Sequence, residues 1–296
     1  GVAAFTEALK NTEARSMELR YHSGEQKYFN PVSYEQLWDI LDAHPSARFV
    51  VGGTDLSLEI TKQFKEPALL VSLEGIPELR TLSEGDAGWH IGSGVCLSDL
   101  EAAVRHKLTS LERMLRFFGA RQIKNRGTVG GNLCTASPIG DLAPTLLSLG
   151  ASVSLRSRSG TRQLPLADFF QGYRQTALQQ GEILESVQIP PFPAGSAQVR
   201  TASYKVSKRQ ELDISTVSAG CYLHLDESEQ VVEARFAFGG MAATPARASH
   251  VEQALVGKAW TEDNLEAALA LLEKDFTPID DHRGSAWYRQ TVAGNL

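Results

Sequence analysis

Apolar residues recur at helical spacing in several stretches of the chain, and typical capping residues precede them. Ser33, Ser98 and Thr109 are each followed three residues later by Glu or Gln. This is the spacing of a capping box, in which two side chains satisfy backbone N–H groups at a helix start. Asp141 likewise precedes an apolar stretch that ends at Gly150. The pattern predicts helices over residues 33–44, 98–107, 109–120, 141–150, 247–256, 261–274 and 285–293.

Short apolar runs bounded by turn residues predict strands, and their order indicates the fold class. Residues 152–166 predict a hairpin that turns at Ser159-Gly160. The strand within residues 185–195 ends in three prolines and a glycine, which makes this stretch the strongest candidate for a domain boundary. Strands followed by helices, as predicted beyond this boundary, favour an α+β fold over a doubly wound sheet. The other predicted strands are residues 49–51, 68–73 and 89–94, with the first two expected to be buried, and residues 199–207, 215–225 and 230–240.

Two glycine-rich segments are the candidates for chemistry, VVGGTDL at residues 50–56 and GTVGGNLCTASPIGD at residues 127–141. Glycines let consecutive backbone N–H groups turn toward one point, an arrangement that binds anions and above all phosphates. Asp141 could be a helix cap or a ligand for sugar hydroxyls. Both segments could equally be surface turns, and neither contains a P-loop or a Rossmann fingerprint. The hydroxyls that could add donors are those of Thr54, Thr128, Thr135 and Ser137.

Composition and charge narrow the functional classes. The chain has 296 residues, a net charge of -6 and three cysteines without a CxxC pair. This argues against a general nucleic-acid binder and against a disulfide framework, zinc site or iron–sulfur cluster built from this chain alone. No apolar run approaches the ~20 residues of a membrane helix, and no secretory signal is recognisable, so a cytoplasmic protein is expected. The initial Gly suggests a segment of a longer polypeptide or a processed chain, with residues 1–22 as a linker or arm.

Three ordered motifs resemble the FAD-binding segment of the xanthine dehydrogenase and aldehyde oxidase family of molybdenum hydroxylases. They are ARFVVGGTDL, FFGARQIKNRGTVGGNLCTASPIGDLAPTLLSLGA and SYKVSKRQELDIS, and DHRGSAWYRQ near the end resembles the family's C-terminal flavoprotein segment. The resemblance implies a PCMH-type α+β fold, in which two lobes clasp FAD and a C-terminal lobe with a small antiparallel sheet and helices follows. The implied FAD-binding domain covers residues 23–195, with lobes at about 23–82 and 83–195, and the C-terminal domain covers residues 196–296.

The resemblance also implies individual roles. Residues 49–56 match the loop that wraps the pyrophosphate and ribityl region, and the second segment matches the diphosphate and adenosine side. Phe118 matches an aromatic facing the isoalloxazine, Leu184 an apolar contact, and Lys205 a basic residue at the ring. No residue of this chain is expected to be catalytic or to bind a metal. The implied FAD contacts are Phe49, Val50, Val51, Gly52, Gly53, Thr54, Asp55, Leu56, Phe118, Thr128, Val129, Gly130, Gly131, Asn132, Thr135, Asp141, Leu184 and Lys205.

Each of these side chains also has an ordinary structural interpretation. Phe118 lies on the apolar stripe of its helix and could be a core residue, Lys205 could be a solvated strand residue, and Asp141 could be only an N-cap. Arg209 and Asp213 could be charges of a flexible loop, although the family's equivalent loop borders the flavin. Cys134 is expected to have no redox role, because the groups of its segment expected to bind the ligand are the N–H donors of Val129 to Asn132.

The implied function is that of an electron-transfer flavoprotein, part of a small subunit of a bacterial enzyme. The resemblance to xanthine dehydrogenase implies oxidation of hypoxanthine and xanthine to urate at a molybdopterin centre elsewhere, with iron–sulfur clusters relaying electrons to FAD and NAD+ as acceptor. The implied partners are an upstream iron–sulfur domain and a molybdopterin subunit in a hetero-oligomer. The alternatives are the flavoprotein of an aldehyde oxidase or carbon monoxide dehydrogenase, with another acceptor such as O2 or a quinone, and a cofactor-free binding or assembly module.

Overall fold

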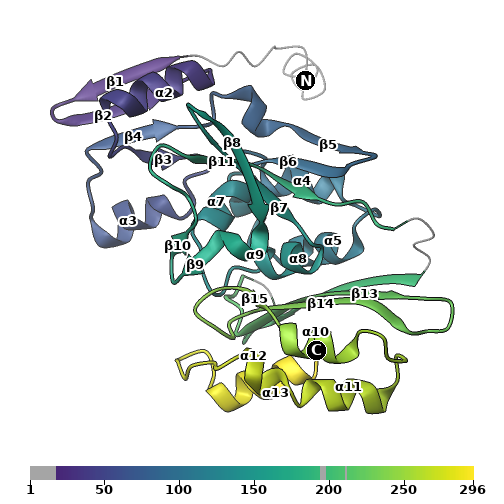
Figure 1. The fold of residues 1–296 in the computed structure, drawn as a ribbon. Coiled ribbons are helices and arrows are strands. Elements are labelled where there is room, and N and C mark those ends of the chain that lie inside the picture. The colour runs from purple at the N-terminus through teal and green to yellow at the C-terminus, as the bar shows by residue number, and fades with distance from the viewer. Residues whose placement is uncertain (1–17, 194–197, 211) are drawn as a thin grey trace, which may run out of the picture.

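The computed structural model describes residues 18–193, 198–210 and 212–296. Most of the expected N-terminal arm, the end of the proline-rich boundary and Glu211 of the SKRQELDIS motif lie outside these residues. The described chain forms three main sheets, each with its own helices, which follow one another from the top to the bottom of Figure 1. In this part of the chain, no helix has both the length and the apolar character needed to cross a membrane.

The first sheet has the strand order β1-β2-β4-β3. Strands β1 and β2 are antiparallel, whereas β4 runs parallel to both β2 and β3. Its hydrophobic core includes Phe29 and Val71 from the sheet and Leu37 and Trp38 from α2. The elements are β1 (Leu19–Ser23), β2 (Gln26–Asn30), α2 (Tyr34–Ala43), β3 (Arg48–Val50), α3 (Leu56–Gln63) and β4 (Leu69–Ser72). The ordered lobe thus includes residues 19–22, which the sequence had assigned to the arm.

Strand β3 contradicts the prediction of a buried strand at residues 49–51. It lies at the edge of its sheet, and Phe49 is 36% exposed. The following helix, α3, buries none of its residues. Within the run FVV, Phe49 is exposed at the sheet edge, whereas Val51 packs partly buried against the core of this sheet.

Capping was predicted correctly for one of the three boxes. The Ser33 hydroxyl accepts a hydrogen bond from the Gln36 N–H, and the Gln36 side chain accepts one from Val32. Ser98, in contrast, lies inside α4 (Leu97–Ala103), where the Leu97 N–H donates to the distant Gly127 carbonyl. Thr109 is the first residue of α5 (Thr109–Arg116) and caps nothing. At α4 and α5, a tertiary contact or a preceding turn determines where the helix begins, and the predicted capping box does not form.

The central sheet is fully antiparallel, with the order β5-β6-β11-β7-β8. The predicted hairpin at residues 152–166 is confirmed as β7 and β8, although Ser157 pairs with Gly160, so the turn residues are Arg158 and Ser159. The elements are η1 (Pro77–Arg80), β5 (Leu82–Gly85), β6 (Gly88–Gly92), α6 (Arg121–Lys124), α7 (Val129–Cys134), α8 (Leu142–Ser148), β7 (Ser152–Ser157), β8 (Gly160–Pro165), α9 (Leu166–Phe169), β9 (Phe170–Gly172), β10 (Gln175–Thr176) and β11 (Ile183–Ile189).

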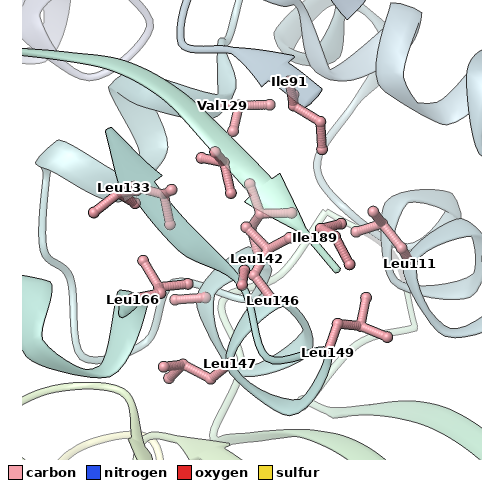
Figure 2. Close-up of a cluster of buried hydrophobic side chains, with 14 of the residues drawn as sticks. Ile91, Leu111, Val129, Leu133, Leu142, Leu146, Leu147, Leu149, Leu166 and Ile189 are labelled. Carbon is pink, nitrogen blue, oxygen red and sulfur yellow. The ribbon is translucent and has the colours of Figure 1, made fainter. Parts of the chain in front are cut away.

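Helix α8 lies at the centre of the largest hydrophobic core. Leu142 and Leu146 point toward Ile189 of β11 in Figure 2, and Val129 and Leu133 of α7 belong to the same cluster. All seven residues of α8 are buried. Because the other side of α8 packs on the third sheet, this helix joins the central sheet to the C-terminal part of the chain.

The C-terminal part is an antiparallel sheet of order β12-β13-β14-β15 covered by helices. Figure 1 shows the sheet between the central helices and α10 to α13. The three strands predicted here are confirmed, whereas the predicted helix at residues 261–274 is divided into two. The elements are β12 (Val199–Val206), β13 (Val217–Leu225), β14 (Val231–Gly239), β15 (Ala246–Arg247), α10 (Ser249–Leu255), α11 (Glu262–Leu269), α12 (Leu272–Asp275) and α13 (Ala286–Gly294).

Arg289 fastens α13 to this sheet. Its guanidinium is buried and donates to the carbonyls of Thr216 and Gly240 and to Asp281. Desolvation raises the pKa of Asp281, but hydrogen bonds from the Arg283 N–H and from Arg289 outweigh it and lower the pKa to about 2. The ionised form of Asp281 is therefore favoured by folding.

Replacing Asp281 by asparagine should lower the free energy of unfolding by about 2 kcal/mol at neutral pH. The folded-state pKa lies below the unfolded value, so this stabilisation is present above about pH 4 and is lost as the pH falls toward about 2. Urea unfolding of both proteins across this range measures the difference. A difference that stays constant down to the lowest pH would contradict the assignment.

Candidate functional site

The two glycine-rich segments contact each other at their backbones. A Cβ atom built on Gly52 would lie 1.8 Å from the carbonyl oxygen of Arg126, and one built on Gly127 would lie 3.4 Å from Oγ1 of Thr54. Since real Cβ atoms do not approach other atoms to less than 3.0 Å, only glycine fits at position 52 without movement of the chain. The structure therefore brings together two segments that the sequence could only list separately.

The first segment carries free hydrogen-bond donors. Residues 51–55 connect β3 to α3, outside any helix or strand. Among the acceptors of the described chain, none accepts a hydrogen bond from the N–H groups of Gly52, Gly53, Thr54 or Asp55. Asp55 occupies the N-cap position of α3, but its side chain makes no capping bond. Unpaired N–H groups and the positive end of a helix dipole together favour an anion here.

The second segment differs from the expected open loop. Residues 129–134 form α7, capped by the Thr128 hydroxyl, which accepts from the Gly131 N–H at 3.2 Å. The Val129 and Gly130 N–H groups donate to the carbonyls of Val95 and Ser93, at 3.0 and 2.8 Å. The Asn132 N–H donates to the Thr128 carbonyl. All four N–H groups from Val129 to Asn132 therefore have partners within the chain, and their expected role at the cofactor stays a prediction.

The reason is a close packing contact. A Cβ atom on Gly130 would lie 2.5 Å from Cβ of Ser93, so this glycine lets α7 approach the chain after β6. The accessible groups of this segment include the exposed Gly131 backbone and the half-buried side chains of Asn132 and Thr135. Thr135 donates its hydroxyl to the Gly131 carbonyl. Whether these groups contact FAD stays a prediction.

Asp141 and Lys205 form a buried ion pair between the central and C-terminal parts of the chain. Lys205 Nζ lies 2.7 Å from Asp141 Oδ2, with side-chain exposures of 8% and 7%. The Ser215 hydroxyl donates to the other Asp141 oxygen at 2.5 Å. Lys205 is thus not a solvated strand residue, and the Asp141 side chain makes no capping hydrogen bond to α8. Their charges offset each other.

The two apolar candidates lie at the central core. Leu184 is 4% exposed on β11 and belongs to the core cluster. Phe118 follows the C-terminal cap of α5 rather than lying in that helix, and packs half-buried against the same cluster. In this structure, therefore, Leu184 is a core residue and Phe118 packs against the core. Cys134 is half-buried, and desolvation raises the pKa of its thiol to about 12, which disfavours a reactive thiolate.

Sequence reasoning missed Ser215 and Arg174. Arg174 lies at the tip between β9 and β10, where its N–H donates to the Ala136 carbonyl at 3.2 Å. Its Nη1 atom lies 3.9 Å from Asp55 Oδ2. Arg174 therefore connects the second glycine-rich segment, at Ala136, to the first, at Asp55. No sequence signal marks this arginine, because the contact exists only once the hairpin has folded onto α7.

Comparison with known proteins gives two family matches that cover most of the chain. Residues 20–192 match the FAD binding domain in molybdopterin dehydrogenase, and residues 202–296 match the CO dehydrogenase flavoprotein C-terminal domain. Xanthine dehydrogenase from Emericella nidulans is 33% identical over 93% of this chain and 21% of its own length. Xanthine dehydrogenase/oxidase from Rattus norvegicus is 31% identical over 97% of this chain and 22% of its own length. The chain thus spans about a fifth of these relatives.

Solved structures of related enzymes have the same fold as this chain. A carbon monoxide dehydrogenase chain from Hydrogenophaga pseudoflava matches with a TM-score of 0.84 and 27% identity, over 94% of this chain and 95% of that chain. A quinoline 2-oxidoreductase chain from Pseudomonas putida 86 matches with a TM-score of 0.80 and 26% identity, over 90% and 92%. These matches confirm the resemblance and the PCMH-type α+β fold. The chain belongs to the FAD-binding flavoprotein domains of the molybdenum hydroxylase family, which includes xanthine dehydrogenase and carbon monoxide dehydrogenase.

Proposed function

We propose that this chain holds FAD as the electron-transfer portion of a cytoplasmic xanthine dehydrogenase-like enzyme. In this proposal, hypoxanthine and xanthine are oxidised to urate at a molybdopterin centre in another segment or subunit. Iron–sulfur clusters relay the electrons, and NAD+ is the final acceptor. The observation that carries the proposal is the junction of the two glycine-rich segments, where Gly52 to Asp55 present N–H groups without partners in the described chain.

The residues at the junction fit the cofactor. FAD has a diphosphate, and backbone N–H groups at a helix start bind such anions without bulky side chains. Gly52, Gly53, Thr54 and Asp55 would hold the diphosphate. Asn132 and Thr135 would add polar side chains from the second segment. When bound, FAD supplies the chemistry that connects one-electron carriers to a two-electron acceptor.

The region assigned to the flavin ring requires one change from the sequence expectation. Lys205 was expected to offer a positive charge to the reduced ring, but in this structure Asp141 neutralises it at 2.7 Å. In our proposal the ion pair of Asp141 and Lys205 holds this part of the site in one conformation. Phe118 shields the flavin ring from water.

The absorption spectrum of the purified protein tests the central claim. We expect flavin absorbance, and release of about one FAD per chain on denaturation, since the proposal places one cofactor in one site. A protein that contains no flavin, and that takes up none when FAD is added, would contradict the proposal and favour a cofactor-free binding or assembly module.

The structural match to carbon monoxide dehydrogenase supports a second candidate. The chain could be the flavoprotein portion of an enzyme of that type or of an aldehyde oxidase, with O2 or a quinone as acceptor. Reoxidation of the reduced assembled enzyme by NAD+, O2 and a quinone, followed by stopped-flow absorbance, separates these candidates. Fast reoxidation by NAD+ alone supports the first proposal.

A further inference from the structure

Arg174 occupies a position that the proposed function does not yet use. We propose that its guanidinium, which makes only a weak ion pair with Asp55, binds the diphosphate of FAD. This inference rests on the proposed function and extends it from backbone donors to a third element of the site, the turn between β9 and β10.

The backbone of Arg174 is seated against the second glycine-rich segment. Its N–H donates to the carbonyl of Ala136, directly after the end of α7. Both residues are non-glycine residues in the left-handed region, with φ of 54° for Arg174 and 45° for Ala136. Such conformations are unfavourable for residues with a Cβ atom and persist where the surrounding structure fixes them. The tip of the hairpin therefore has a defined place beside the junction.

The side chain of Arg174 reaches the side chain of Asp55, one of the four residues whose N–H groups are free in the described chain. Its Nη1 atom lies 3.9 Å from the carboxylate of Asp55, the residue that precedes α3. Both side chains are about half exposed, at 53% and 52%. At this distance and exposure the pair is weak, so the guanidinium keeps donors available for a ligand.

A bound diphosphate would place several negative charges close together where the two glycine-rich segments meet, and a cation there would reduce their repulsion. Asp55 places a carboxylate among the N–H groups that would hold the diphosphate, and a diphosphate adds two further negative charges. Arg126 is bonded to Glu74, and Lys205 is bonded to Asp141. Arg174 can offset the repulsion and present the planar fork of donors that matches phosphate oxygens.

The test compares two flavins that differ in the diphosphate. The purified protein is freed of flavin, and FAD or riboflavin is titrated back while flavin fluorescence is followed. Arg174→Ala should weaken FAD binding about 10- to 100-fold, the range of a charge-assisted hydrogen bond, and leave riboflavin binding within about twofold. Arg174→Lys, which keeps the charge but loses the fork, should fall between.

Arg158→Ala is the matched control, since Arg158 is also exposed but pairs with Asp39 and Asp42 of α2. It should leave both affinities unchanged. An equal loss for FAD and riboflavin in Arg174→Ala would show that the arginine only positions the hairpin, and unchanged FAD binding would show no role; either result overturns the inference while the proposed function stands. Failure of the unmodified protein to bind either flavin would overturn both.

Discussion

Replacing Gly52 by alanine should abolish retention of FAD. The added Cβ atom would lie 1.8 Å from the Arg126 carbonyl oxygen. The obstacle is backbone, so the two glycine-rich segments must separate. Separation displaces the N–H groups of Gly52 to Asp55 from the second segment, and a loss of about 3 kcal/mol of binding free energy would lower the affinity more than 100-fold. Flavin absorbance per protein after gel filtration measures the result.

Gly85→Ala is the control for this experiment. Gly85 lies in β5, and a Cβ atom there would meet no atom within 4 Å. Flavin content should be unchanged in this variant. Circular dichroism of Gly52→Ala checks that the secondary structure persists. Full flavin content in Gly52→Ala, with an unchanged fold, would show that the junction does not form the diphosphate site.

Local patterns predicted the framework of this fold well. The strands β12, β13 and β14 and the hairpin of β7 and β8 follow from alternation and turn residues close in sequence. The cap of α2 succeeded for the same reason, because Ser33 and Gln36 need only each other and the adjacent backbone. Where neighbours in sequence decide the structure, the sequence carries enough information to predict it.

The site could be predicted only as a set of residues. The resemblance to the family named two segments that the structure places in contact. The partners of the Val129 and Gly130 N–H groups, Val95 and Ser93, however, belong to another part of the chain. A glycine that admits a ligand and one that admits a neighbouring backbone have the same signature in the sequence. Only the folded structure distinguishes Gly130 from the free donors at Gly52 to Asp55.

The ion pair of Asp141 with Lys205 leads to the second large effect. Removing one partner leaves a buried charge without compensation, so Asp141→Asn and Lys205→Met should each lower the free energy of unfolding by about 3 kcal/mol. The double variant should lose less than the sum, because neither charge is then left unpaired. Urea unfolding of the four proteins gives the coupling energy. Additive losses would contradict the pairing.

Flavin content in the same series tests whether the pair also serves the cofactor. If the charge pair of Asp141 and Lys205 also orders the flavin site, the double variant should regain stability without regaining flavin, because both charges are gone. If the pair only joins the two parts of the chain, flavin content should follow stability through the series. Arg158→Ala, which removes a surface ion pair, should change neither quantity appreciably. The comparison thus separates a buried charge pair that holds the domains together from one that also shapes the cofactor site.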